Sequence, residues 1–314
     1  MSEEYLWDKT GEPDHDVAEL ERLLGQFQHR QAGQQVKPPK PRVTRAAWWL
    51  AAAAVITAGV VIPLSQRGTL TDWRYSAKGL EARAVRTGQV IDTGGASEAR
   101  LESSFTGQLE IEPRSRLRLV ASADKQQRFR LERGTIHALI WASPGRFVVD
   151  TPAARTVDLG CRYTLHMDED GAGLLTVETG WVAFEWKGTE SFIPAGAACQ
   201  TRPQRGPGTP YFADAPDALR AALERFDAAP GGATMTAALP LARPRDAMTV
   251  WHLMTRVKSS ERADAYDRLS SLVVLPAAAS RDGILRGETA AVDAAWDALD
   301  LGSAQVWRNW KRGW

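Results

Sequence analysis

The sequence has few of the residues from which catalytic and metal sites are built. It contains 5 histidines and 2 cysteines in 314 residues, and the histidines are scattered over three regions of the chain. It also lacks the motifs G-x-S-x-G and H-E-x-x-H, a P-loop and a glycine run of the Rossmann type. Because a zinc site draws its ligands from clusters of such residues, we predict no metal, no cofactor and no enzymatic activity.

An excess of charge of one sign is missing as well. The 39 Lys and Arg residues stand against 38 Asp and Glu residues, which leaves a formal net charge of +1. Proteins that bind nucleic acid through the phosphate backbone usually carry a broad basic field. The balanced charge therefore predicts no direct contact with nucleic acid.

One long apolar run interrupts this mixed sequence. Residues 46–64 carry no charge, and a helix of this length covers about 29 Å, close to the hydrocarbon core of a bilayer. Trp48 and Trp49 lie at its N-terminal edge beside Arg45, and such side chains favour the lipid–water interface. We therefore predict a transmembrane helix over residues 46–65, with these three residues at the membrane interface. A cleaved signal peptide and a buried helix of a soluble protein are the alternatives.

Basic residues flank this run unevenly. Four of them precede it with no acid among them, whereas Arg67 stands alone after it. The positive-inside rule then predicts a single-pass protein with its N-terminus in the cytoplasm and its C-terminal mass across the membrane. The four preceding residues are Lys37, Lys40, Arg42 and Arg45.

The two cysteines, Cys161 and Cys199, both lie on the predicted exported side. An oxidising compartment would permit a disulfide between them. Two buried thiols are the alternative.

The segment before the run, residues 1–45, is too short to form a core of its own. Apolar residues at helical spacing predict one amphipathic helix that starts near Pro13, and residues 28–41 have the composition of a linker. An apolar stripe without a core needs a partner: another protein, the membrane surface or a second copy. A weakly ordered tail is the alternative. The predicted partner-binding residues are Trp7, Leu20, Leu23, Leu24 and Phe27.

Residues 72–212 predict a mainly β domain. Apolar residues alternate with polar ones in short runs, and Gly and Pro interrupt these runs every 8–12 residues. The segment 128–141 is echoed by 174–186 at an offset of 46 residues, which suggests two copies of one unit. A β-solenoid and a β-sandwich are both compatible with this pattern.

Residues 214–314 predict a small all-α C-terminal domain. The apolar spacing changes here from a period of two to a period near 3.6. Of the 12 tryptophans in the chain, several gather near the C-terminus. They predict either core filling of this domain or an aromatic contact surface.

The β region resembles the FecR domain family, whose members occur in membrane-anchored periplasmic regulators. Short motifs in a fixed order carry the resemblance. They are GQVIDT at 88–93, ARL at 99–101, GQLEI at 107–111, LERG at 131–134, FVVDTP at 147–152, VDLGCRY at 157–163, VETGWV at 177–182 and AG at 195–196.

This resemblance implies a β-solenoid fold and the topology of a sigma regulator, or anti-sigma factor, in the inner membrane. A cytoplasmic segment would hold an extracytoplasmic-function sigma factor, and the periplasmic part would receive a signal from an unknown protein or ligand. In this scheme the N-terminal segment would contact the sigma factor, residues 46–65 would lie in the lipid bilayer, and the exported domains would receive the signal. The alternative function is a membrane-anchored envelope scaffold with no sigma partner.

Overall fold

The computed structural model describes residues 69–77, 80–95, 97–123 and 126–303, and all of these belong to one compact unit. The predicted N-terminal segment and transmembrane helix lie outside the described residues and stay predictions. Within the described ranges, no helix is both long and apolar enough to cross a membrane.

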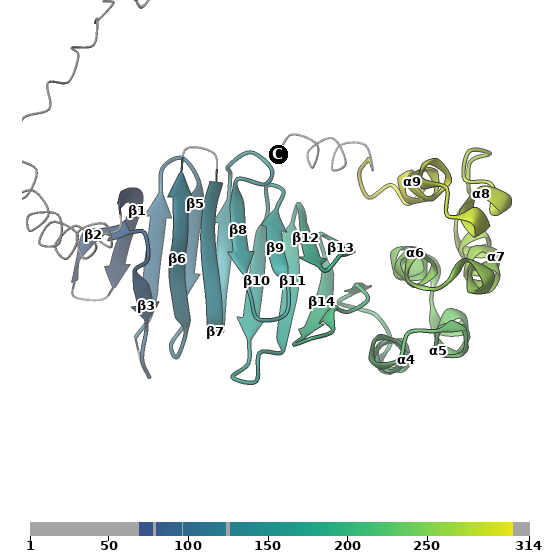
Figure 1. The fold of residues 1–314 in the computed structure, drawn as a ribbon, viewed down its shortest axis with the longest axis horizontal. Helices are drawn as coiled ribbons and strands as arrows, with labels where there is room; N and C mark the ends of the chain where they lie inside the picture. Colours follow the sequence, from purple (N-terminus) through teal and green to yellow (C-terminus); the bar gives the residue numbers. More distant parts are fainter. Residues whose placement is uncertain (1–68, 78–79, 96, 124–125, 304–314) are drawn as a thin grey trace, which may run out of the picture. The chain divides into compact units, whose positions relative to one another are not determined.

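In the described part of the chain, a large and mainly antiparallel β region is followed by a small helical region (Figure 1). The strands are β1 (Leu70–Ala77), β2 (Leu80–Arg86), β3 (Val90–Asp92), β4 (Ala99–Ser103), β5 (Gly107–Ile111), β6 (Arg116–Ala123), β7 (Gln126–Ile140), β8 (Phe147–Asp150), β9 (Arg155–Asp158), β10 (Arg162–Met167), β11 (Gly173–Thr179), β12 (Trp181–Trp186), β13 (Thr189–Pro194), β14 (Ala197–Arg202), β15 (Gly206–Pro207) and β16 (Tyr211–Phe212).

These strands form two hydrogen-bonded sheets that share β7. In sheet A the order is β2-β1-β4-β5-β7-β10-β11-β14, with β15 and β16 both paired to β14. In sheet B the order is β3-β6-β7-β8-β9-β12-β13. Every ladder among the described strands is antiparallel except the one between β7 and β8.

Strand β7 passes from sheet B to sheet A at Gly134. The residues before it pair with β6, and those after it pair with β5 and β10. Gly134 has a φ of 86°, and a Cβ at this position would overlap the backbone and side chain of Ser115. Glycine adopts this left-handed conformation at no steric cost, so Gly134 fixes the point at which the strand changes sheets.

Gly134→Ala is expected to lower the free energy of unfolding by about 2–3 kcal/mol, because it adds the overlap with Ser115 to left-handed backbone strain. Gly94→Ala is the matched control. Gly94 also has a positive φ, 60°, but no atom lies within 4 Å of the position of its added Cβ. This control should cost about 1 kcal/mol. Denaturant unfolding of the two variants measures both values, and equal costs would contradict the role given to the overlap.

The two sheets pack face to face over one core. Trp73 of β1 in sheet A meets Phe129 of β7 in sheet B edge-on, with ring centroids 5.1 Å apart. The same indole lies 6.1 Å from Phe147 of β8 and donates a hydrogen bond from Nε1 to Oε1 of Gln127, at 3.1 Å. All three aromatic side chains are fully buried. Burial of rings of this size is a main source of stability for the β region.

The sequence echo corresponds to two similar local structures in opposite sheets. The first copy is a hairpin of β6 and β7 in sheet B, and the second is a hairpin of β10 and β11 in sheet A. Each hairpin leads through a glycine with positive φ, Gly134 or Gly180, into the other sheet. Stacked solenoid coils would place equivalent strands in the same sheet. The exchange of sheets is the geometry of a two-sheet sandwich.

The helical region begins after β16. Its α-helices are α4 (Asp217–Ala228), α5 (Gly232–Ala238), α6 (Ala247–Arg256), α7 (Arg262–Leu272), α8 (Arg281–Arg286) and α9 (Thr289–Asp297). Short 3-10 turns join them: η1 (Leu239–Leu241), η2 (Pro244–Asp246) and η3 (Ser259–Glu261).

The hydrophobic core continues from the sheets into the helices. Trp296 of α9 packs against Trp251 of α6, with ring centroids 4.9 Å apart, and against Phe192 of β13, at 5.6 Å. Its Nε1 donates to the carbonyl oxygen of Gly302, at 2.9 Å. For Trp296 the core-filling alternative is therefore the right one. Trp307, Trp310 and Trp314 lie outside the described residues.

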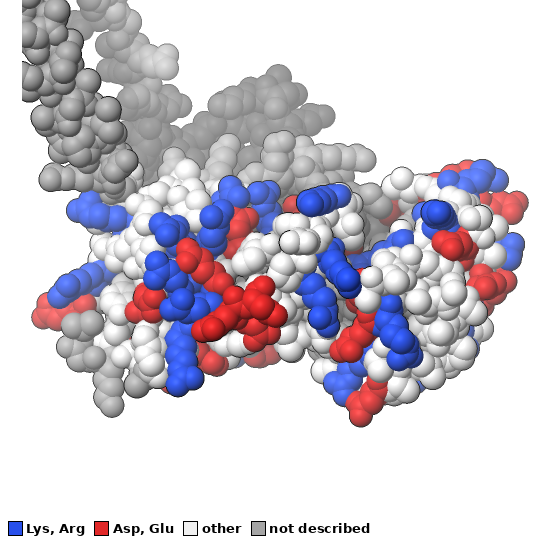
Figure 2. All heavy atoms as spheres, turned by 60° about the horizontal axis from the view of Figure 1, so that its bottom comes forward, with Lys and Arg blue, Asp and Glu red and all other residues white. Residues whose placement is uncertain are grey.

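The surface carries charges of both signs side by side. On the face drawn in Figure 2, Lys and Arg side chains lie next to Asp and Glu side chains. On sheet B, for example, Arg116 pairs with Asp92 and with Glu132, each at 2.8 Å. Since such pairs are partly or fully exposed to solvent, each contributes little to stability.

Candidate functional site at the junction of strands and helices

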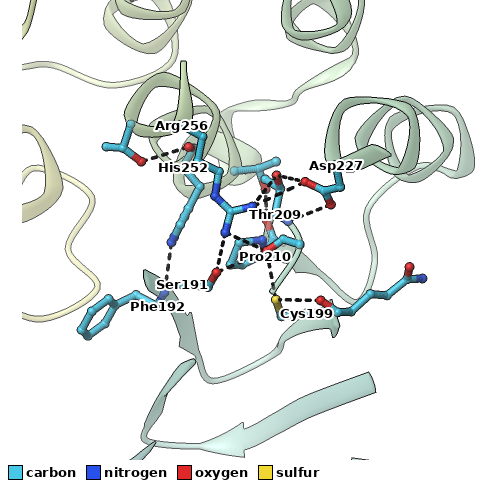
Figure 3. Close-up of polar contacts among 12 residues, drawn as sticks. Ser191, Phe192, Cys199, Thr209, Pro210, Asp227, His252 and Arg256 are labelled. Carbon is cyan, nitrogen blue, oxygen red and sulfur yellow. Dashed lines mark hydrogen bonds and ion pairs between the residues drawn. The ribbon is translucent and has the colours of Figure 1, made fainter. Parts of the chain in front are cut away.

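Helix α6 is almost entirely buried, yet it carries a line of polar side chains. Thr249, His252 and Arg256 are three and four residues apart, so they share one face of the helix. Thr249 Oγ1 donates to the carbonyl oxygen of Pro210, at 2.9 Å, and His252 Nε2 accepts from the backbone N–H of Phe192, at 3.1 Å. The polar face of α6 therefore points at the end of the β region (Figure 3).

Arg256 makes the largest number of contacts at this junction. Its guanidinium donates to Ser191 Oγ of β13, to the carbonyl oxygen of Gly208 at 2.9 Å and to Thr209 Oγ1 at 3.1 Å. It also pairs with Asp227 Oδ1 of α4, at 3.4 Å. The side chain is only 11% exposed. One guanidinium thus joins β13, the segment after β15 and the end of α4.

Asp227 completes the network from the other side. Its carboxylate accepts the backbone N–H of Thr209, at 2.8 Å, and the hydroxyl of the same residue, at 2.7 Å. The acid and the guanidinium therefore hold the same short segment between them. Figure 3 shows the two side chains converging on Thr209 from different helices.

Burial dominates the electrostatics of this ion pair. It raises the pKa of the Asp227 carboxyl, although the charge of Arg256 acts in the opposite direction. It also lowers the pKa of Arg256, although Asp227 opposes that shift. An ion pair of this kind gains little net stability over an apolar pair of similar volume, but losing one partner leaves a buried charge alone. Loss of either side chain is therefore expected to destabilise the junction.

Neither the histidine nor the thiol of the junction is available for acid–base chemistry. Burial lowers the pKa of His252 to about 3, so the ring is neutral. Its Nδ1–H donates to the carbonyl oxygen of Met248, at 2.9 Å, and its Nε2 is the acceptor for Phe192. Burial raises the pKa of Cys199 to about 12, which keeps that thiol protonated. At neutral pH His252 therefore acts only through its two hydrogen bonds, and Cys199 stays a thiol.

A cleft of about 490 Å³ opens beside Arg256 and touches both regions. Phe192, Phe226 and Trp251 line its apolar side. Arg202 and Arg205, both exposed, belong to its polar lining. Clefts that combine an apolar wall with a few polar groups are the usual form of ligand sites. A ligand or protein segment bound here would contact the strands and the helices at once.

A second buried polar cluster lies between β9 and β10. Asp158 accepts the N–H of Gly160 at 2.6 Å and the S–H of Cys161. No basic side chain pairs with this acid in the described ranges. Burial raises the pKa of Asp158 to about 7, against the effect of both hydrogen bonds. The nearby Tyr163 hydroxyl is also buried, and the described residues offer it no hydrogen-bond partner.

The two cysteines are free and buried, which is the second of the two alternatives raised by the sequence. Cys161 donates to Asp158, whereas Cys199 donates to the carbonyl oxygen of Gly208, at 3.1 Å. Cys161 lies just before β10, and Cys199 lies in β14. Strand β11 lies between β10 and β14 in sheet A. Each thiol thus has its own acceptor, and no disulfide joins the two cysteines in this structure.

Two other histidines lie on neighbouring strands of sheet A. Each bridges a carboxylate and a threonine, at distances between 2.7 and 3.1 Å. The two chains are Glu112–His137–Thr164 and Asp168–His166–Thr135. The backbone amides of β7 and β10 already take part in the sheet ladders, so they offer these threonines no oxyanion hole. The half-exposed chains act as cross-strand pairs that stabilise the sheet.

The predicted partner and membrane residues all precede the described part of the chain: Trp7, Leu20, Leu23, Leu24, Phe27, Arg45, Trp48 and Trp49. No group of three or more metal-ligating side chains is found within the described ranges. The junction residues were missed from sequence. The spacing of Thr249, His252 and Arg256 on an apolar helix was the one available signal, whereas Ser191 and Thr209 meet Arg256 only through the tertiary fold.

Residues 89–183 match the family model described as "FecR protein", so this stretch is a FecR domain, as its motifs predict. It reaches from just before β3 into β12 and includes Asp158 and Cys161, whereas the junction lies C-terminal to it. No curated protein matches the chain. Two crystal structures of a "putative anti-sigma factor" from Parabacteroides distasonis ATCC 8503 are similar, each with 15% identity, a TM-score of 0.33 and coverage of 38% of this chain. The chain spans 57% and 56% of their lengths.

Proposed function

We propose that this protein is a single-pass inner-membrane regulator that holds an extracytoplasmic-function sigma factor on its cytoplasmic side and responds to a signal on its periplasmic side. The observation that carries the proposal is a FecR domain at residues 89–183 that follows an apolar run at 46–64. Regulators of this family have this order of parts. The proposed sigma contact is the N-terminal segment, through Trp7, Leu20, Leu23, Leu24 and Phe27.

In this proposal the junction receives the signal. A periplasmic protein or ligand would bind at the cleft beside Arg256, where strands and helices meet. Because one network joins α4, α6 and β13, a change in the helices would reach the strands of the β region through Arg256. The FecR domain would then pass the change to the membrane helix. A binding and coupling role fits the lack of a free base or a reactive thiol at the junction.

The double variant Trp7→Ala/Leu23→Asp is expected to raise transcription of the genes controlled by one extracytoplasmic-function sigma factor. Loss of one central aromatic contact commonly costs 2 kcal/mol or more, about a 30-fold loss of affinity, and a charge in the apolar stripe adds to this. Sequencing of cellular RNA measures the change. Gln26→Ala, a polar position in the same predicted helix, is the matched control.

Unchanged transcription in the double variant would contradict the regulator and favour the scaffold. In that case deletion of residues 1–35 would also leave the phenotype intact, and the exported regions alone would carry the function.

A further inference from the structure

Most of the large apolar side chains exposed on the described residues gather at one end of the β region. They include Phe105 at 80% exposure, Leu70 at 55%, Trp141 at 50% and Trp181 at 39%. The other exposed large apolar side chains in the described ranges are Leu174, at 38%, and Val274, at 94%. A cluster of exposed aromatic side chains at one end of a domain usually marks a contact surface.

Sheet register places the first three of these residues together. Strand β1 runs antiparallel to β4, with Arg74 opposite Glu102, so the start of β1 lies beside the end of β4. A hydrogen bond from Ser103 to Asp72 links the two strands at this level. Leu70 therefore lies next to the β4–β5 turn, which carries Phe105.

Trp141 lies on the other side of the same turn. Its backbone N–H donates to the carbonyl oxygen of Thr106, at 3.1 Å, and its Nε1 donates to that of Ser104, also at 3.1 Å. The indole is thus held in place although half of it faces solvent. A fixed aromatic ring with a satisfied N–H can present its apolar face to a partner at little entropic cost.

Trp181, the first residue of β12 in sheet B, lies at the same end of the β region. The N–H of Ile140 donates to the carbonyl oxygen of Cys161, at 2.9 Å, and the N–H of Leu159 donates to that of Trp181, at 3.3 Å. The start of β10 and the start of β12 are therefore at the same end as the end of β7. Arg162, an exposed residue at the start of β10, adds a positive charge there.

We propose that this end of the β region, which we call the aromatic end, lies against the periplasmic leaflet of the membrane that anchors the chain. The inference rests on the proposed membrane anchor. Only five residues separate Leu64, the last of the apolar run, from Leu70, the first of β1. An extended chain of that length spans at most about 20 Å, so the membrane surface lies within that distance of Leu70. Trp side chains and snorkelling Arg side chains are typical of the lipid–water interface.

Lipid contact at residue 105 tests the proposal. The full-length Phe105→Cys variant carries an environment-sensitive fluorophore on its new thiol and is reconstituted into phosphatidylethanolamine–phosphatidylglycerol vesicles with spin-labelled lipid. We expect a blue shift of the emission and several-fold stronger quenching than in vesicles without spin label. Val274→Cys is the matched control, because Val274 is 94% exposed and lies in the helical region. It should show neither change.

The outcomes separate this inference from the proposed anchor. If the full chain leaves the vesicles in a carbonate wash, the anchor fails and the proposed function falls with it. If the chain stays in the vesicles and residues 105 and 274 are quenched equally weakly, the anchor stands and the aromatic end does not touch lipid. Protection of residue 105 that depends on protein concentration, without lipid quenching, would show a second copy at this surface and would also overturn the proposal.

Discussion

Arg256→Met is expected to lower the free energy of unfolding by about 3–5 kcal/mol, the range found when one partner of a buried ion pair is removed. The substitution leaves the Asp227 carboxylate buried without its cation and removes donors to Ser191 and to the Gly208 carbonyl. Methionine fills much of the same space, so the loss is electrostatic rather than a cavity effect. Denaturant unfolding of the full chain in detergent, followed by tryptophan fluorescence, measures it.

A double variant separates the ion pair from packing. Replacing both charges, as Arg256→Met/Asp227→Leu, should recover a large part of the lost stability, because an apolar pair of similar size replaces two buried charges. Arg281→Gln is the control, since Arg281 and Asp267 form an exposed pair and this change should cost less than about 1 kcal/mol. A loss in Arg256→Met no larger than in Arg281→Gln would contradict the role of the junction.

The second large effect is a pH dependence from Asp158. The carboxyl has a pKa of about 7 in the folded protein, against an ordinary value of 3.8. Between these two values the folded state binds the extra proton, so the contribution of Asp158 to stability is present at low pH and is lost as the pH rises towards 7. At about 1.4 kcal/mol per pH unit, the loss over this window is roughly 4 kcal/mol.

Asp158→Asn isolates this contribution. Because asparagine does not titrate, the variant should gain stability relative to the natural chain as the pH rises from 4 to 7, by up to roughly 4 kcal/mol. His252 acts in the opposite sense, because its pKa is lowered to about 3 and its stabilising effect is lost as the pH falls below about 6.5. Since His252 is present in both proteins, it cancels in the difference. Unfolding at several pH values measures that difference, and a value independent of pH would contradict the assignment.

Local sequence patterns predicted a β region followed by a helical region, because alternation and helical spacing depend on neighbouring residues. Alternating apolar residues marked β5, β6 and β7, and the change of period marked the start of the helical region near Asp217. The internal echo was visible as well. Sequence alone did not show that the two copies lie in opposite sheets, because a hairpin of this sequence is compatible with either sheet. The chain passes from one sheet to the other at Gly134 and at Gly180.

The candidate site depends on contacts that no local pattern contains. Arg256 meets Ser191 and Thr209 across long stretches of sequence, so neither partner could be read from spacing. The fate of Cys161 and Cys199 was undecided for the same reason. Their separation is set by strand order in sheet A, which the sequence leaves open.

The central claim, that the N-terminal segment holds a sigma factor, is tested most directly by co-purification. The full chain is isolated from its own membranes in mild detergent, and bound proteins are identified by mass spectrometry for the natural sequence, the Gln26→Ala control and the Trp7→Ala/Leu23→Asp variant. The proposal predicts that one extracytoplasmic-function sigma factor accompanies the first two and is missing from the third. Absence of any sigma factor from the natural chain, or its equal recovery with the double variant, would contradict the claim.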